Sequence, residues 1–261
     1  MSAAPYGETL GSLLFPGFQH SLGTLQPTAL LAEQLLQQRP PQRARTVWRL
    51  DAGFGSDSAI NWLLARDYQL VAKGYNSRRA QKVVSQVVPD TWQVIRPNKW
   101  VAIVPEGVRY ARRTQTLAVR WITASNRERC ALLIHTLLDQ EPRQVIACYD
   151  QRGGAMEVTS IKQDKFGLQL THRRKRSWFA QEAWIILTDL AHNLLIWLHD
   201  WMLSGSSFET YGSLRLVQDI LSIPGRLEFK GDKLQKVALQ ASHPFAHEMQ
   251  ACLVHLFQNL C

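Results

Sequence analysis

A segment that runs strand, loop, helix and strand constrains the fold of this chain more than any other feature. Residues 46–50 (Thr-Val-Trp-Arg-Leu) and 69–73 (Gln-Leu-Val-Ala-Lys) are typical of buried strands. Between them, apolar residues recur at helical spacing after a loop that contains two glycines. Two strands joined by such a helical crossover are parallel neighbours in one sheet. The sequence therefore predicts an α/β fold.

The pattern changes after residue 75. Short runs rich in β-branched and aromatic residues, separated by prolines, predict a strand-rich segment over 76–148. The predicted strands of this segment are 83–88, 92–95, 100–104 and 117–123, and a further strand is expected over 145–149.

The strand-rich segment also carries most of the positive charge. The 261 residues include 30 Lys and Arg against 21 Asp and Glu, a net charge of +9. Ten of these bases and two of the acids lie between residues 73 and 120, so this stretch alone holds +8. Such concentrated charge suits a polyanion, of which nucleic acid is the commonest, and the alternative is a solvated face of a basic protein.

The remaining patterns divide the chain into four parts. An edge strand or hairpin over 6–25 and a helix over 29–36 precede the crossover, and helices over 180–202 and 244–260 follow the strand-rich segment. The expected parts are the first part of the α/β core (1–75), a basic β-rich insert (76–148), the helical part of the core (149–203) and a helical C-terminal tail (204–261).

Composition excludes several classes of protein. The four cysteines include no Cys-x-x-Cys pair, which argues against a zinc ribbon or a disulfide framework. The most apolar window, residues 183–203, contains two aspartates and two histidines, so it predicts a buried helix of a soluble protein and not a membrane span. With no secretory signal recognisable before Arg39, we expect a cytoplasmic protein with no membrane partner.

Two carboxylates lie at positions that are typical of catalytic residues. Asp51 directly follows the first buried strand, and open α/β sheets place functional groups at the carboxyl ends of their strands. Glu157 lies at the predicted start of a helix. Each also has a simpler interpretation, Asp51 as a turn or capping residue and Glu157 as a helix-terminal glutamate favoured by the macrodipole.

Together these segments resemble the DDE transposases of bacterial insertion sequences. Residues 49–56 (Arg-Leu-Asp-Ala-Gly-Phe-Gly-Ser) are similar to the strand that carries the second aspartate of the family. The Y–R–E–K signature of the family is similar to Tyr149, Arg152, Glu157 and Lys165, and 190–194 (Leu-Ala-His-Asn-Leu) resembles the helix that follows it. The resemblance covers about residues 6–200 and implies a ribonuclease-H-like mixed sheet with flanking helices, interrupted by the β-rich insert.

The resemblance implies a reaction and a set of roles. The family cleaves and joins DNA strands with two divalent cations, Mg²⁺ or Mn²⁺, and carboxylates are suitable ligands for them. Asp51 and Glu157 would be two of the three catalytic metal ligands. DNA contacts are expected from Tyr149, Arg152, Lys162, Lys165, Arg78, Arg79, Arg112, Arg113, Arg173 and Arg174. The implied partner is double-stranded DNA, at transposon ends and target, and a homo-oligomer is compatible with it.

Two departures from the family pattern weaken this assignment. Glu157 and Lys165 are eight residues apart where the family has seven, which on a helix turns the lysine about 100° away, and Lys162 is an alternative. Before Asp51 the acidic residues are Glu8 and Glu33, and neither ends a buried strand in the right order. The first catalytic aspartate and its strand are therefore expected to be missing.

The expected function is accordingly that of an N-terminally truncated transposase with weakened metal binding and impaired catalysis. Two alternatives stay open: a catalytically inactive DNA-binding chain that regulates an intact transposase, and a gene remnant. Trp92, Trp100 and Trp121 of the basic insert are expected in the core, with stacking on an unpaired base as the alternative.

Overall fold

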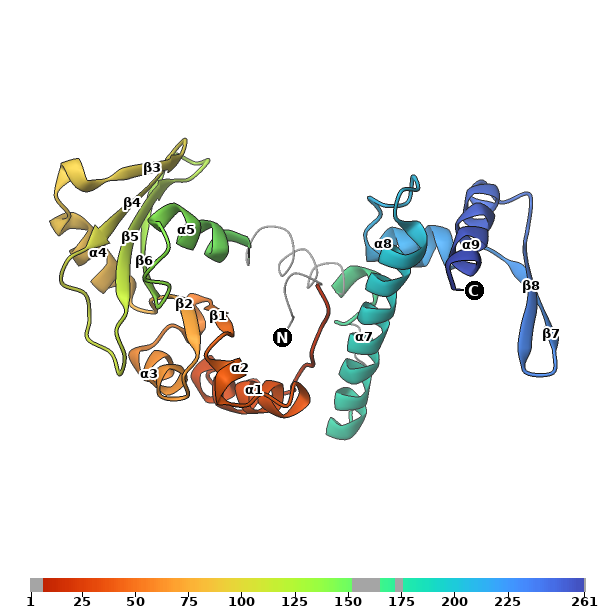
Figure 1. Cartoon of the computed structure of the whole chain (residues 1–261), viewed down its shortest axis with the longest axis horizontal. Coiled ribbons are helices and arrows are strands. Elements are labelled where there is room, and N and C mark those ends of the chain that lie inside the picture. The colour runs from red at the N-terminus through yellow and green to blue at the C-terminus, as the bar shows by residue number, and fades with distance from the viewer. Residues whose placement is uncertain (1–6, 152–164, 172–175, 261) are drawn as a thin grey trace. The chain divides into compact units, whose positions relative to one another are not determined.

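A computed structural model of the chain describes residues 7–151, 165–171 and 176–260. The chain divides into two compact units. We call Phe15–Met156 the sheet unit, and Met1–Leu14 together with Glu157–Cys261 the helical unit. Figure 1 shows the elements of both, and each unit is described by itself.

A six-stranded mixed sheet forms the centre of the sheet unit, in the order β1-β2-β6-β5-β4-β3. The strands are β1 (Val47–Leu50), β2 (Gln69–Lys73), β3 (Gln93–Arg96), β4 (Lys99–Val104), β5 (Gln115–Ile122) and β6 (Glu128–His135). β1 and β2 are parallel, with Val47 opposite Gln69 and Leu50 opposite Ala72, which confirms the predicted crossover. β3 to β6 form an antiparallel meander whose last strand pairs with β2. The strands of the predicted basic insert therefore belong to the same sheet as β1 and β2.

Helices cover both faces of this sheet. They are α1 (Ser21–Leu35), α2 (Pro40–Arg43), α3 (Asp57–Ala65), α4 (Ser77–Gln86) and α5 (Pro142–Gln151), with single 3₁₀ turns at η1 (Ala52–Phe54) and η2 (Pro89–Thr91). Successive strand residues point to opposite faces, so Leu70 and Ala72 pack with α1, α3 and α4, whereas Val71 packs with α5. This architecture confirms the predicted α/β class.

Two segments predicted as strands are helical. Residues 83–88 mostly belong to α4, because Val83, Val84 and Val87 follow helical spacing and pack against the core. Residues 145–149 belong to α5, whose apolar side lies on the sheet. β-branched composition favours a strand, but spacing of three and four residues places these side chains on one side of a helix.

The helical unit is built on one long helix, α7 (Trp178–Leu198), which confirms the helix predicted over 180–202. The helix is not buried as expected, because Leu187, Leu190 and Leu194 are exposed. The elements that follow are η4 (His199–Leu203, a π-helical turn), α8 (Ser213–Arg215), η5 (Leu216–Ile220), β7 (Gly225–Lys230), β8 (Lys233–Leu239) and α9 (Ala246–Leu260). Their apolar side chains surround the buried Leu203 and Phe208. The hairpin of β7 and β8 is not among the predicted elements and lies in a tail expected to be helical. In the described part of the chain, no helix is long and apolar enough to span a membrane.

The first described residues do not form the edge strand or hairpin predicted over 6–25. Apart from a single bridge residue, Thr9, the segment 7–15 belongs to no strand, and α1 begins already at Ser21. The backbone of Thr9 is bonded to the side chain of Asn193 in α7, with distances of 2.8 Å from the Thr9 nitrogen and 2.9 Å to its carbonyl oxygen. A side chain of α7 therefore holds the backbone of this segment.

Candidate active site

Asp51 lies directly after β1, at the carboxyl end of the two parallel strands. Its Oδ1 accepts a hydrogen bond from the Ala52 nitrogen at 2.7 Å and caps η1. Asp51 is also exposed. The capping interpretation of Asp51 and a position open to a substrate are thus both present.

The loop after Asp51 is held against the end of β2. The Tyr75 nitrogen donates to the Gly55 carbonyl oxygen at 3.0 Å. A Cβ at Gly55 would lie 1.7 Å from the carbonyl oxygen of Lys73, so the close approach requires glycine. This contact fixes the loop that carries Asp51.

Beside this loop, residues at the starts of α3 and α4 line a hollow of about 160 Å³. Asp57 accepts two hydrogen bonds from Arg79, at 3.0 and 2.9 Å, and one from the Tyr110 hydroxyl at 2.8 Å. The Arg79 hydrogen bonds, opposed by partial burial, lower the pKa of Asp57 below its ordinary value. Burial, followed by the bond to Asp57, raises the pKa of Tyr110. Of these three residues only Arg79 is among the predicted site residues, and its pairing with Asp57 and Tyr110 is not predicted from the sequence.

The last turn of α5 lies beside β1. An Nη1 of Arg49 donates to the carbonyl oxygen of Cys148 at 3.4 Å. The next residue, Tyr149, is half-buried and packs against the core on the α5 side of the sheet. The sheet unit therefore brings the strand that precedes Asp51 next to the start of the predicted signature segment.

Several predicted site residues lie outside the described residues, namely Arg152, Glu157, Lys162, Arg173 and Arg174. Lys165 is exposed and belongs to the helical unit. Within 7–151, 165–171 and 176–260, no group of three or more His, Cys, Asp or Glu side chains is arranged to hold a metal ion. Asp51 is thus the one predicted metal ligand that the structure describes.

The predicted DNA contacts in the basic insert (residues 76–148) are of two kinds. Arg79 is held by the carboxylate described above, and Arg112 donates to the carbonyl oxygen of Tyr68 at 2.8 Å. Arg78 and Arg113 are exposed, and no ion pair joins either to another residue that the structure describes. To contact a phosphate, Arg79 would have to give up its ion pair with Asp57. Arg78 and Arg113 could contact a phosphate without breaking an ion pair to any described residue.

The tryptophans of the basic segment have packing partners in the sheet unit. Trp92 and Trp100 enclose the guanidinium of Arg120, at 4.5 and 5.2 Å from the two ring centroids. Trp121 packs against the core on the α5 side, and Lys73 lies 5.7 Å from its ring. These contacts favour the expected role in packing over stacking on a base.

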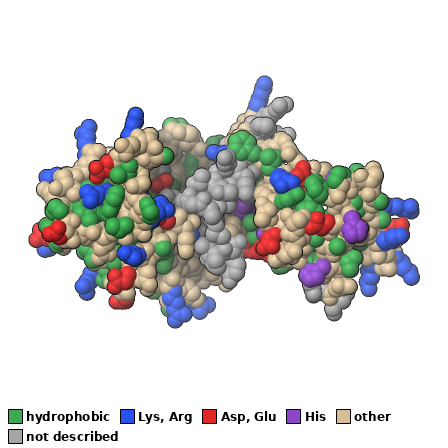
Figure 2. All heavy atoms as spheres, turned by 90° about the horizontal axis from the view of Figure 1, so that it is seen from above, with side chains coloured by type: hydrophobic (Ala, Val, Ile, Leu, Met, Phe, Trp, Pro, Cys, Tyr) green, Lys and Arg blue, Asp and Glu red, His purple; other side chains and the backbone are tan. Residues whose placement is uncertain are grey.

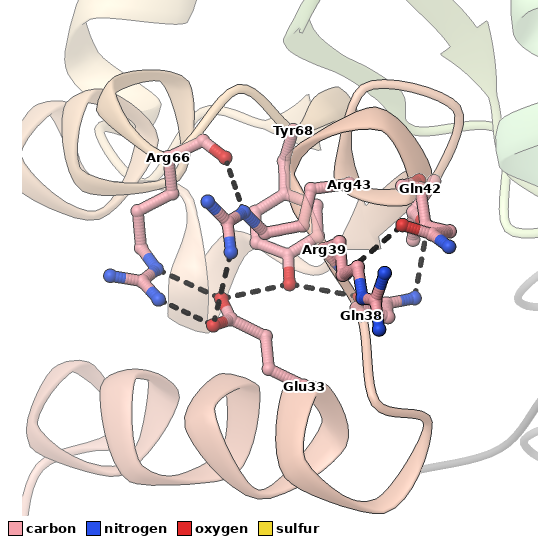
Figure 3. A network of polar contacts seen from close by, with 8 residues as sticks. Glu33, Gln38, Arg39, Gln42, Arg43, Arg66 and Tyr68 are labelled. Carbon is pink, nitrogen blue, oxygen red and sulfur yellow. Dashed lines mark hydrogen bonds and ion pairs between the residues drawn. The ribbon is translucent and has the colours of Figure 1, made fainter.

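Glu33, one of the acidic residues before Asp51, is occupied by structural contacts (Figure 3). Its carboxylate accepts two hydrogen bonds from Arg66, one of them at 2.8 Å, and one from the Tyr68 hydroxyl at 2.9 Å. An Nη of Arg43 lies 3.7 Å away. The Arg66 hydrogen bonds are the main cause that lowers the pKa of Glu33, against partial burial. This network connects α1 to Arg43, the last residue of α2, and to the residues that follow α3.

Glu8, the other acidic residue before Asp51, is bonded within the helical unit. It accepts a hydrogen bond from the indole nitrogen of Trp197 in α7 at 2.5 Å. Both acidic residues that precede Asp51 are therefore committed to structural contacts.

A comparison with protein families matches almost the whole chain. The family described as "Transposase DDE domain group 1" matches residues 7–260. A comparison with curated proteins finds no match. The mixed sheet with flanking helices is consistent with the ribonuclease-H-like fold of DDE domains, a family that acts in DNA transposition, binds DNA and generally uses divalent metal ions. On a match of this extent, the chain belongs to the group 1 family of transposase DDE domains.

Proposed function

We propose that this chain takes part in DNA strand cleavage and transfer, with Asp51 and Glu157 as two of its metal ligands. The observation that carries the proposal is the position of Asp51, exposed at the carboxyl end of β1 in a chain whose family match spans residues 7–260. The last turn of α5 lies beside β1, and Glu157 follows the end of α5 by six residues in the sequence.

The donor set suits Mg²⁺, or Mn²⁺ in its place. Asp51 and Glu157 offer carboxylate oxygens, which hard divalent cations prefer. When bound, the cations would supply positive charge at the reacting phosphate.

We assign the other polar residues to DNA binding at transposon ends and target. Tyr149, Arg152 and Lys165, with Lys162 as the alternative to Lys165, would hold phosphates near the cut. The arginines proposed to hold the flanking duplex are Arg78, Arg79, Arg112, Arg113, Arg173 and Arg174. Arginine suits this role because its planar guanidinium binds phosphate through two hydrogen bonds.

We further propose that residues 1–261 alone catalyse strand transfer weakly. The family pattern has three carboxylates, and the acidic residues before Asp51 are bound to other side chains, Glu8 to Trp197 and Glu33 to Arg66. A site with one ligand fewer binds its metal ions less tightly. The same observation favours a second candidate function, a DNA-binding chain without catalytic activity that regulates an intact transposase.

Nicking of supercoiled plasmid that carries the DNA flanking the coding sequence separates these functions. We expect slow, Mg²⁺-dependent or Mn²⁺-dependent nicking that Asp51→Asn abolishes, because asparagine retains the cap and loses the charge. Asp90→Asn removes an exposed charge from the basic segment and serves as the matched control. Nicking that persists in Asp51→Asn would refute the catalytic assignment, and plasmid binding without nicking in either metal would support the second candidate.

A further inference from the structure

We propose that the β7–β8 hairpin is a DNA-binding ribbon that lies in a groove of duplex DNA. The inference rests on the proposed function, because that function makes DNA the partner. It concerns residues outside the predicted site and outside the basic segment of the sheet unit.

The hairpin is anchored at its base and exposed toward its turn. The Gln240 nitrogen donates to the Pro224 carbonyl oxygen at 2.8 Å, and Ile223 and Leu239 pack against the core of the helical unit. Most residues of both strands beyond this base are exposed, and Figure 1 shows the hairpin extending from the level of α9. An isolated two-stranded hairpin is only marginally stable, so the anchored base keeps the exposed end folded.

The turn of the hairpin is narrow. Two residues, Gly231 and Asp232, connect Lys230 to Lys233, and Gly231 has φ +60°. Glycine in the first position of a two-residue turn maintains the natural twist of the two strands. The element is therefore a regular ribbon up to its tip, apart from a register shift after Glu228.

The strand register separates an apolar face from a charged face. On the apolar face Leu227 lies opposite Val237, and Phe229 lies opposite Leu234. Leu227 is 57% exposed and Phe229 61% exposed. The charged face carries Arg226, Glu228, Lys230, Lys233 and Lys236.

The charged face has an excess of lysine. Arg226 pairs with Glu228 at 3.6 Å, whereas no ion pair joins Lys230, Lys233 or Lys236 to any residue in the described part of the chain. Lys230 and Lys233 lie directly opposite each other, and like charges in such a pair destabilise the strands. A bound anion would remove this repulsion. Figure 2 shows Lys and Arg side chains gathered at this end of the helical unit.

Duplex DNA matches both faces of the hairpin. The major groove admits a two-stranded β-ribbon, and apolar side chains there contact thymine methyl groups. Lysines on the other face would reach phosphates, and the hairpin has a net charge of +2 with its two acidic residues included. A second copy of the chain packed on Leu227 and Phe229 would leave the lysines of the opposite face without an anionic partner.

The salt dependence of binding tests the charged face. Fluorescence anisotropy with a short labelled duplex of mixed sequence compares the wild-type chain with the triple variant Lys230→Gln, Lys233→Gln, Lys236→Gln. Each lost phosphate contact reduces the slope of log K against log salt by about 0.9, so we expect the triple variant to reduce it by about 2 to 3. The control removes the same charge from exposed arginines of the sheet unit, with Arg45→Gln, Arg127→Gln and Arg129→Gln.

An unchanged slope in the lysine variant, or an equal reduction in the control, overturns the proposal. If the wild-type chain still binds the duplex in that case, the hairpin assignment fails and the proposed function stands. If the wild-type chain binds no duplex, the proposed function fails as well.

Substitution of the apolar face provides a second test. We expect Leu227→Ala with Phe229→Ala to lower duplex affinity roughly tenfold without a change of slope, because apolar contacts release no counterions. Phe179→Ala, at a phenylalanine of α7 that is 79% exposed, is the control. Sedimentation velocity completes the test. A dimer that this double variant abolishes, with unchanged duplex affinity, would identify a second copy as the occupant and refute the proposal.

Discussion

Asn193 connects the first described residues to α7 through both atoms of its side-chain amide. Its Oδ1 accepts from the Thr9 nitrogen at 2.8 Å, and its Nδ2 donates to the Thr9 carbonyl oxygen at 2.9 Å. The neighbouring His192 ring lies 3.1 Å from the Gly7 carbonyl oxygen. The Leu-Ala-His-Asn-Leu run at 190–194, which in the sequence is only a point of resemblance, thus has a structural role.

We expect Asn193→Asp to destabilise the helical unit by about 1–3 kcal/mol, because it removes the donor to Thr9 and places a carboxylate against a carbonyl oxygen. Urea unfolding followed by tryptophan fluorescence measures the loss. Asn61→Asp is the matched control, because Asn61 accepts from the Ala111 nitrogen at 2.7 Å and an aspartate retains that acceptor. Equal losses in the two variants would contradict the role assigned to Asn193.

Glu33 gives the sheet unit a pH-dependent contribution to stability. Hydrogen bonds from Arg66 and Tyr68 lower its pKa below the ordinary value of 4.5, so the ionised carboxyl stabilises the fold. This contribution is complete above the unfolded pKa and is lost as the pH falls through the lower, folded value. We expect Glu33→Gln to cost about 1–3 kcal/mol at neutral pH, with the difference from wild type shrinking below pH 4.5. Urea unfolding over a pH series measures it, and a difference that does not depend on pH would contradict it. Glu106→Gln, at an exposed carboxylate, is the control.

At the scale of elements, the end of β2 and the loop after β1 depend on one glycine. Gly55→Ala would place its Cβ 1.7 Å from the Lys73 carbonyl oxygen, so the loop and the strand must separate. We expect a loss of about 3 kcal/mol or more in the stability of the sheet unit, measured by thermal unfolding. Gly17→Ala meets no atom within 4 Å and is expected to leave stability nearly unchanged. Similar melting temperatures for the two variants would show that the loop relaxes without cost.

Elements with one unambiguous periodicity could be predicted from the sequence. β2 occupies the predicted residues 69–73, and the long helix over 180–202 is α7 with its π-helical turn. α4 could not be assigned from composition, because its valines have strand propensity and helical spacing at once. The β7–β8 hairpin had a usable signal in Gly231-Asp232, two turn residues between short runs containing Leu and Phe or Leu and Val.

The candidate site also contains residues that could be predicted from the sequence and residues that could not. Asp51 could be located because a strand pattern, an acidic residue and glycines follow one another in the chain, although β1 is an edge strand in which only Leu50 is buried, not the predicted buried strand. The group of Asp57, Arg79 and Tyr110 could not, because Asp57 is 22 and 53 residues from its partners and only the folded chain brings them together. Local sequence patterns carry no information about contacts between residues so far apart in the chain.

At the scale of the whole molecule, each unit has buried residues of its own. Val71 and Leu117 lie in the core of the sheet unit, and Leu203 and Phe208 lie in the core of the helical unit. Units with separate cores can open separately, and hydrogen exchange reports the free energy of each opening. Hydrogen exchange measured peptide by peptide therefore shows whether a substitution lowers the free energy of opening in one unit or in both.

We expect Gly55→Ala to accelerate exchange in β5 and β6 and to leave α9 unchanged, because the substitution separates the loop from β2 within the sheet unit. Asn193→Asp should do the reverse, since its lost hydrogen bond lies within the helical unit. Mass spectrometry of peptides from β5 and α9 under conditions where the wild-type chain is folded measures both effects, and Gly17→Ala again provides the baseline. Faster exchange in both peptides for either substitution would mean that the two cores unfold as one cooperative unit.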